Sequence, residues 1–167
     1  MAHTLNIIGV HLLFERIEQG QHSVLLGLRA PQSDYAPDTW HFPAGHCEFE
    51  SVSQCAVRES QEELGIPLEP EHLDLVHTVH LLDPSSTQPR LGLVLRVRHW
   101  TGEPRLMEPD KCSQWAWWPM SALPEPIVPY TKAALEGIAA GTPLTELGWR
   151  PQPAALPHGP DPAAKES

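Results

Sequence analysis

The chain has 167 residues, a formal net charge of -10 and three cysteines. This length suffices for one domain with a sizeable core, and the negative charge argues against a nucleic-acid polymer as partner, since binding to a phosphate backbone relies on Lys and Arg. No apolar run is long enough to span a bilayer and no signal-peptide pattern opens the sequence, so we expect a cytoplasmic protein without membrane contact. The cysteines lack paired metal-ligand spacing, which is typical of reduced thiols.

Six segments have the composition or the alternation of β-strands. In the fifth, Leu91, Leu93 and Leu95 alternate with a more polar set, which predicts a strand with one better-buried face. The expected strands cover residues 6–15, 23–28, 39–42, 73–82, 90–100 and 115–118.

Two helices are expected between and after these strands. The first should begin at Val52, because Ser51 and Gln54 fit a capping box. It should end at Gly65, which suits the left-handed position after a helix, and Pro67 prevents its continuation. The second is predicted over residues 130–140, where apolar residues cluster on one side before Gly141. From residue 150 to 167 the chain is too rich in proline to pack, so we expect one domain over residues 1–149 followed by a disordered tail.

The first helix carries three carboxylates, Glu59, Glu62 and Glu63, within one arc about 100° wide. Like charges at these spacings repel by a few tenths of a kcal/mol per pair, and Arg58 can offset part of this through Glu62. A divalent cation would offset more, because Mg²⁺ takes carboxylate oxygens and keeps positions open for substrate phosphates. The alternative interpretation is a solvated acidic face.

The segment from Gly45 to Ile66 resembles the Nudix box, whose pattern is G-x5-E-x7-R-E-U-x-E-E-x-G-U, with U a bulky apolar residue. The second half matches at Arg58, Glu59, Glu62, Glu63, Gly65 and Ile66, and the upstream glutamate falls on Glu50. Two positions depart from the pattern. Only four residues separate Gly45 from Glu50, and Ser60 stands where a bulky apolar residue is usual.

This resemblance covers roughly residues 5 to 140 and implies an α/β fold, an α/β/α sandwich around a mixed sheet. It further implies an enzyme that hydrolyses a nucleoside diphosphate linked to another group, with Mg²⁺ or Mn²⁺ as cofactor. By the family pattern, Glu59 and Glu63 are the first metal ligands and Arg58 positions a carboxylate. Glu62 and Glu50 are further ligands, and one glutamate of the cluster can accept the proton of the attacking water.

Beyond the arginine and glutamates of the box, the resemblance to MutT-like nucleoside triphosphate pyrophosphohydrolases suggests four more site residues. Glu108 is the candidate for an additional ligand or general base; the alternative is a plain loop residue beside Pro109. Arg29, at the end of an apolar run, is expected to contact the nucleotide, although a solvated strand end would look the same. Gly45 and Tyr130 are placed at the substrate by the same resemblance.

The leading hypothesis is a Mg²⁺-dependent Nudix hydrolase that converts a nucleoside triphosphate to nucleoside monophosphate and pyrophosphate. One alternative keeps the mechanism with a dinucleotide or nucleotide-sugar substrate. Another is a Nudix-fold module that binds a nucleotide without turnover, since the shortened loop before Glu50 displaces one glutamate of the box. The expected partner is a small nucleotide, and a homodimer is a further expectation because dimers are frequent in this family.

Overall fold

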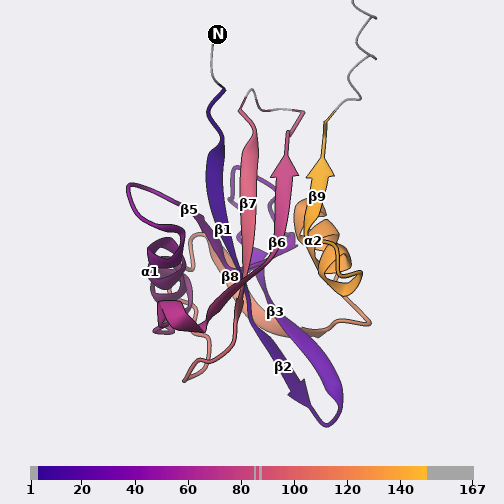
Figure 1. Ribbon diagram of the computed structural model, residues 1–167. Helices are drawn as coiled ribbons and strands as arrows, with labels where there is room; N and C mark the ends of the chain where they lie inside the picture. Colours follow the sequence, from indigo (N-terminus) through magenta and orange to yellow (C-terminus); the bar gives the residue numbers. More distant parts are fainter. Residues whose placement is uncertain (1–3, 85, 87, 150–167) are drawn as a thin grey trace, which may run out of the picture.

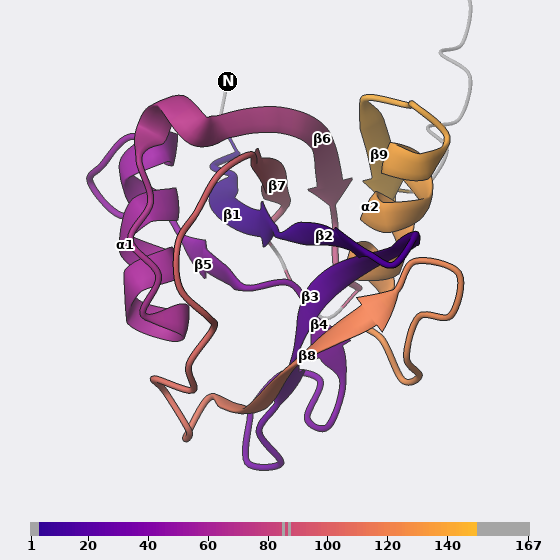
Figure 2. The same ribbon diagram turned by 90° about the horizontal axis from the view of Figure 1, so that it is seen from below.

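The computed structural model describes residues 4–84, 86 and 88–149. In chain order its elements are β1 (Ile7–Leu13), β2 (Glu15–Glu18), β3 (Gln21–Arg29), β4 (Trp40–His41), β5 (Ala44–His46), α1 (Val52–Leu64), η1 (Pro70–His72), β6 (Leu73–Leu81), β7 (Arg90–Val97), β8 (Cys112–Pro119), α2 (Pro129–Ala139) and β9 (Leu144–Leu147). The first sheet has five strands in the order β5-β1-β7-β6-β9. The helices α1 and α2 lie on opposite sides of it (Figures 1 and 2).

The five-stranded sheet is mixed, because β1 runs parallel to β7 and β6 parallel to β9, whereas β5 and β6 pair antiparallel with β1 and β7. The other sheet is centred on β3, which pairs antiparallel with β2, β4 and β8. Two helices flanking a mixed sheet confirm the predicted α/β/α sandwich.

Alternate residues of β1 contribute to two separate cores. Val10 and Leu12 pack with Leu64 of α1, whereas Leu13 packs with Leu135 of α2. All five side chains are at most 1% exposed. Since successive strand residues point to opposite faces, one short strand anchors both helices.

The expected strand over residues 6–15 is wrong as a single element, because the chain changes sheet at Phe14. The first part, β1, pairs with β5 and β7, and the second, β2, pairs with β3. The Phe14 side chain is fully buried, and its carbonyl accepts a hydrogen bond from the Leu25 amide at 3.1 Å. Sequence alternation did not reveal this break or the short strands β5 and β9.

Helix α2 is tied to the sheet by His77 of β6. Its Nδ1 lies 2.8 Å from the Thr142 carbonyl and its Nε2 2.9 Å from the Thr145 hydroxyl. A Cβ at Gly137 of α2 would lie only 2.4 Å from the imidazole, so this contact requires a glycine. One buried side chain therefore joins α2, β6 and β9.

In the part of the chain that the structure describes, no helix has the length and apolarity needed to cross a membrane. The three cysteines, Cys47, Cys55 and Cys112, are free thiols. The proline-rich segment from residue 150 to 167, for which we predicted disorder, lies outside the described residues.

Candidate active site

Helix α1 has the boundaries that its sequence predicts. The Ser51 hydroxyl accepts from the Gln54 amide at 3.2 Å, and the Gln54 side chain accepts from the Ser51 amide at 2.9 Å. At the other end Gly65 is left-handed, with φ of 66°, and its amide donates to Gln61 and Ser60 carbonyls. These caps fix which way each glutamate of the helix points.

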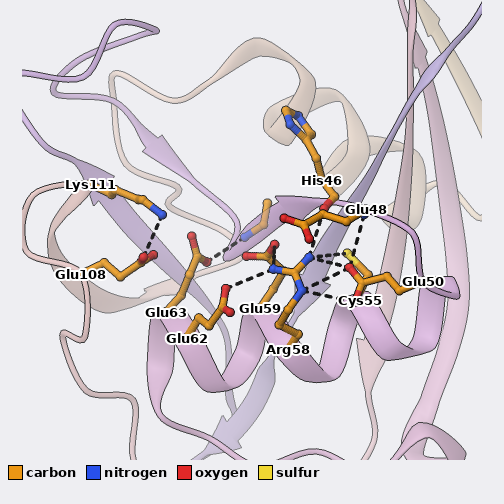
Figure 3. A network of polar contacts seen from close by, with 11 residues as sticks. His46, Glu48, Glu50, Cys55, Arg58, Glu59, Glu62, Glu63, Glu108 and Lys111 are labelled. Carbon is orange, nitrogen blue, oxygen red and sulfur yellow. Dashed lines mark hydrogen bonds and ion pairs between the residues drawn. The ribbon is translucent and has the colours of Figure 1, made fainter.

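Arg58 is the centre of the polar network on this helix (Figure 3). Its guanidinium donates to Glu50 at 2.5 Å, to Glu59 at 2.7 Å and to Glu62 at 3.1 Å. The hydrogen bond from Arg58 lowers the pKa of Glu50, despite some opposing desolvation. Arg58 thus offsets the mutual repulsion of the glutamates, and it does so through three partners where the sequence indicated Glu62.

Glu59 is 9% exposed and points at the backbone of β5. A Cβ at Gly45 would lie 1.8 Å from the Glu59 carboxyl carbon, so only glycine leaves room for this side chain. Burial raises the pKa of Glu59, and the Arg58 guanidinium acts in the opposite direction. Gly45 is therefore needed for the position of Glu59, whether or not it also contacts a substrate.

Glu63 lies one helical turn further along and accepts a hydrogen bond from the Ala44 amide at 2.9 Å. Burial raises the pKa of Glu63 to about 8. The negative charges of Glu59 and Glu108 also raise this pKa, whereas the hydrogen bond from the Ala44 amide lowers it. A carboxyl group with this pKa is mostly protonated at neutral pH unless further positive charge is supplied.

The surroundings of Glu59 and Glu63 fit a divalent cation. Both carboxyls have raised pKa values, and a cation beside them would supply the missing positive charge. Among the described residues, no three acidic, histidine or cysteine side chains form a ready-made cage for a metal. Mg²⁺ does not require such a cage, because it often binds one or two carboxylates and completes its shell with water and substrate phosphates.

A cavity of about 620 Å³ adjoins these two carboxylates. Five of the site residues proposed from the sequence line it: Arg29, Gly45, Glu59, Glu63 and Tyr130. The others, Glu50, Arg58, Glu62 and Glu108, are not among its lining side chains. The structure therefore separates the sequence-derived set into a group that lines the cavity and a group that does not.

Arg29 and Tyr130 approach the cavity from different elements. The Nε of Arg29, the last residue of β3, donates to the Tyr35 carbonyl at 2.7 Å, and its guanidinium lies 5.5 Å from the Tyr35 ring centre. The ring of Tyr130, in the first turn of α2, lies 4.8 Å from that of His11, and burial raises the Tyr130 pKa to about 12. Arg29 thus offers the cavity a positive charge whose position is fixed by Tyr35, and Tyr130 offers a neutral phenol.

Glu108 lies at the carboxyl end of α1 because its loop is bonded to that end. The amides of Arg105 and Met107 donate to the Leu64 and Glu63 carbonyls at 2.9 and 3.4 Å. The Glu108 carboxylate pairs with Lys111 at 2.7 Å, beside Glu63 in Figure 3. Lys111 itself lines the cavity, so the loop supplies a cation as well as a carboxylate.

The cavity-lining side chains that the sequence did not assign to the site include His11, His41, Arg90 and Lys111. The two histidines are in the strands β1 and β4, and neither belongs to a motif that would mark it as part of a site. Arg90 pairs with Ile7 across β1 and β7, although the two are far apart in the sequence. The register of β1 and β7 brings His11 and Arg90 together, and no local motif marks it.

The model of the NUDIX domain matches residues 8–137. The chain belongs to the NUDIX family. The crystal structure of the MutT NUDIX hydrolase from Burkholderia pseudomallei is 30% identical, with 79% of this chain and 97% of that chain covered and a TM-score of 0.66. The match and this neighbour identify a MutT-like Nudix hydrolase.

Two further structures share the fold at lower identity. The MutT protein from Methanosarcina mazei Go1 is 21% identical, with 84% of this chain and 97% of that chain covered and a TM-score of 0.68. The NUDIX domain of Shewanella oneidensis NrtR, solved with ADP ribose, is 16% identical, with coverages of 83% and 88% and a TM-score of 0.66.

Both departures from the Nudix box have a structural counterpart. Ser60 is fully buried, and its hydroxyl donates to the Ile66 carbonyl at 2.9 Å, so the polar group in the core is satisfied. The shortened loop places Glu50 against Arg58 and outside the cavity lining. The polar Ser60 is thus accommodated in the core by its hydrogen bond, whereas the shortened loop affects Glu50, a residue proposed to act in the site.

Proposed function

We propose that this Nudix hydrolase uses Mg²⁺ to hydrolyse a nucleoside triphosphate to nucleoside monophosphate and pyrophosphate. The observation that carries the proposal is the juxtaposition of Glu59 and Glu63 with Arg29 and Lys111 around one cavity. Two carboxylates without full charge compensation suit a divalent cation, and two basic side chains suit the remaining charge of a polyphosphate. Mn²⁺ meets the same requirement.

Glu59 and Glu63 would hold the ion, which when bound neutralises phosphate oxygens and makes a coordinated water more acidic. Arg58 fixes the orientation of Glu59 through the 2.7 Å hydrogen bond. Arg29 and Lys111 would orient the polyphosphate. In the reaction, the water oxygen bonds to phosphorus, one bond of the anhydride bridge breaks, and a carboxylate of the cluster accepts the water proton.

Glu50, Glu62 and Glu108 remain candidates for second roles. Glu50 and Glu62 are held by Arg58, so either would have to leave that guanidinium to reach an ion in the cavity. Glu108 would have to leave Lys111 to act as a base. In the arrangement described, Glu50 and Glu62 are better suited to positioning Arg58 than to coordinating the ion.

The test is a product assay with a panel of nucleoside triphosphates and Mg²⁺ in ¹⁸O-labelled water, with phosphorus NMR to identify products and the labelled phosphate. We expect nucleoside monophosphate and pyrophosphate from at least one member, and no turnover after chelation. Glu59→Gln serves as the inactive control. Release of orthophosphate alone, or no release from any member, would contradict the proposal.

A different nucleoside diphosphate derivative is the second candidate substrate, because the NrtR domain with the same fold was solved with ADP ribose. The same assay separates the two once a diphosphate-bridged dinucleotide and a nucleotide-sugar are added to the panel, since each would yield two phosphate monoesters and no pyrophosphate. A binding module without turnover is the third candidate. It is favoured by the position of Glu50, which pairs with Arg58 and does not line the cavity. Calorimetry showing tight nucleotide binding together with no product would support it.

A further inference from the structure

Three nitrogen atoms around the cavity have no hydrogen-bond partner among the described residues. They are Nδ1 of His11, Nε2 of His41 and Nε of Arg90, and each belongs to a side chain that lines the cavity. A buried polar atom without a partner costs about 1–3 kcal/mol, so native structures rarely leave several together. A molecule in the cavity can supply the missing partners.

Two of these side chains belong to the floor that β1 and β7 form beneath the cavity. In the parallel pairing of these strands Ile7 lies opposite Arg90, and Gly9 lies opposite Gly92. A Cβ at Gly92 or Gly9 would come within 2.9 or 3.3 Å of the His11 imidazole. The two glycines thus give the ring of His11 its space, on an element separate from the helix that carries Glu59 and Glu63.

The chemistry of this floor differs from that of the acidic helix. Burial lowers the pKa of His11 to about 3 and that of His41 to about 4, so both imidazoles are neutral at physiological pH. A neutral imidazole has one donor and one acceptor, whereas Arg90 only donates. The Tyr130 ring beside His11 adds an aromatic surface. This combination suits a flat, uncharged heterocycle with donors and acceptors on its edge.

We propose that His11, His41 and Arg90 form the subsite that selects the nucleobase of the substrate, while the helix carboxylates serve the phosphates. This inference rests on the proposed function in taking the substrate to be a nucleotide. It makes these three side chains specificity-determining and assigns them no part in bond cleavage. An inorganic polyphosphate, which has no base, should therefore be indifferent to them.

The experiment compares a nucleoside triphosphate with inorganic tripolyphosphate as a competitor. His11→Phe keeps a ring of similar size and removes both nitrogens, and Arg90→Met tests the same subsite from β7. We expect each to raise KM for the nucleoside triphosphate about 5- to 100-fold, the range that loss of one buried hydrogen bond gives, with a small change in kcat. The inhibition constant of tripolyphosphate should stay within about twofold.

Two controls separate recognition from folding. His99→Phe alters an exposed histidine outside the cavity and should leave both constants unchanged. His11→Asn restores a polar atom near the Nδ1 position and should reverse part of the rise in KM. A purely structural role of His11 would instead lower Tm and would not raise KM while leaving the tripolyphosphate inhibition constant unchanged. Unchanged KM in both His11→Phe and Arg90→Met would overturn the inference, as would equal rises in KM and the tripolyphosphate constant.

Failure of the proposed function gives a different result. If wild-type protein releases no pyrophosphate, the hydrolysis proposal fails, and calorimetric Kd values for the same two ligands then test the subsite. A Kd that rises only for the nucleoside triphosphate in His11→Phe would still support the inference, and equal changes for both ligands would overturn it.

Discussion

Glu59 and Glu63 on α1 and Glu50 in the loop before it all belong to the Nudix box, yet their surroundings differ. The helical pair lines the cavity, and both carboxyls have raised pKa values. Glu50 instead has a lowered pKa because it accepts hydrogen bonds from Arg58, and it does not line the cavity. At Glu59 burial outweighs the contact with Arg58, whereas at Glu50 the hydrogen bonds from Arg58 outweigh the desolvation.

The difference follows from the stiffness of the two segments. Residues four apart on a helix share a face, so the spacing of Glu59 and Glu63 becomes a fixed geometry once the caps set the helix ends. A loop has no such rule, and Glu50 settles where the Arg58 guanidinium satisfies it. The same motif thus contains a rigid part and a part that adapts to its neighbours.

The largest expected effect comes from removing a charge of the helical pair. Glu59→Gln or Glu63→Gln should lower kcat at least about 100-fold, because a carboxylate that holds the cation supports several kcal/mol of transition-state stabilisation. Steady-state kinetics at saturating Mg²⁺ would measure this, with Glu136→Gln on the exposed face of α2 as the matched control. Near-normal turnover in both variants would remove the helical pair from the mechanism.

The raised pKa of Glu63 should also appear as a pH dependence of stability in the absence of divalent cations. Because the folded state holds a proton up to about pH 8 that the unfolded state loses near pH 4.5, the contribution is fully present below pH 4.5 and is lost as pH rises through 8. Urea unfolding with chelator should show this loss, on the order of a few kcal/mol, between pH 5 and 8. Glu63→Gln should flatten the profile; an equal slope in both proteins would contradict the assignment.

A smaller effect is expected from Gly45→Ala, which should push the Glu59 carboxylate out of place. We expect a loss of about 10- to 100-fold in kcat, equivalent to roughly 1.4–2.7 kcal/mol. A double-mutant cycle with Glu59→Gln provides the control, because Gly45→Ala should cost little more in a protein that already lacks that carboxylate. Full additivity would mean that Gly45 acts independently of Glu59.

The smallest effect is expected for the loop. Glu50→Gln should lower kcat about tenfold or less, since Arg58 keeps its contacts with Glu59 and Glu62. Glu62→Gln is the matched variant, as it removes another partner of the same guanidinium. A loss for Glu50→Gln as large as that for Glu59→Gln would show that the loop does deliver a metal ligand.

The sequence predictions were accurate where the structure depends on residues close together in the chain, and they failed where it depends on residues far apart. The bounds of α1 were predicted correctly because Ser51, Gln54 and Gly65 act within a few residues of the helix ends. The strand β5, Ala44–His46, was missed because three residues carry no periodicity, and its pairing with β1 depends on the fold. A displacement of Glu50 by the shortened loop was one of the alternatives weighed from the sequence, but its contact with Arg58 was not predicted, since the box pattern records spacing and not contacts.

The residues of the cavity floor could not be predicted from the sequence for a further reason. His11 and Arg90 read singly as a strand histidine and a strand arginine, and they share a cavity only because β1 and β7 align Ile7 with Arg90. Nothing near either residue in the sequence encodes that alignment. Arg29, Gly45 and Tyr130, by contrast, were expected at the substrate from resemblance to a known family; they line the cavity, and their contact with a substrate stays a prediction.

The contact between His77 and Gly137 has a consequence for how this cavity can change shape. The imidazole spans the helix, the turn after it and the last strand, so these three segments behave as a single block. Tyr130 belongs to that block, on the same helix. Any widening of the cavity on the Tyr130 side must therefore move helix and strand together, and Tyr130 cannot shift independently of that block.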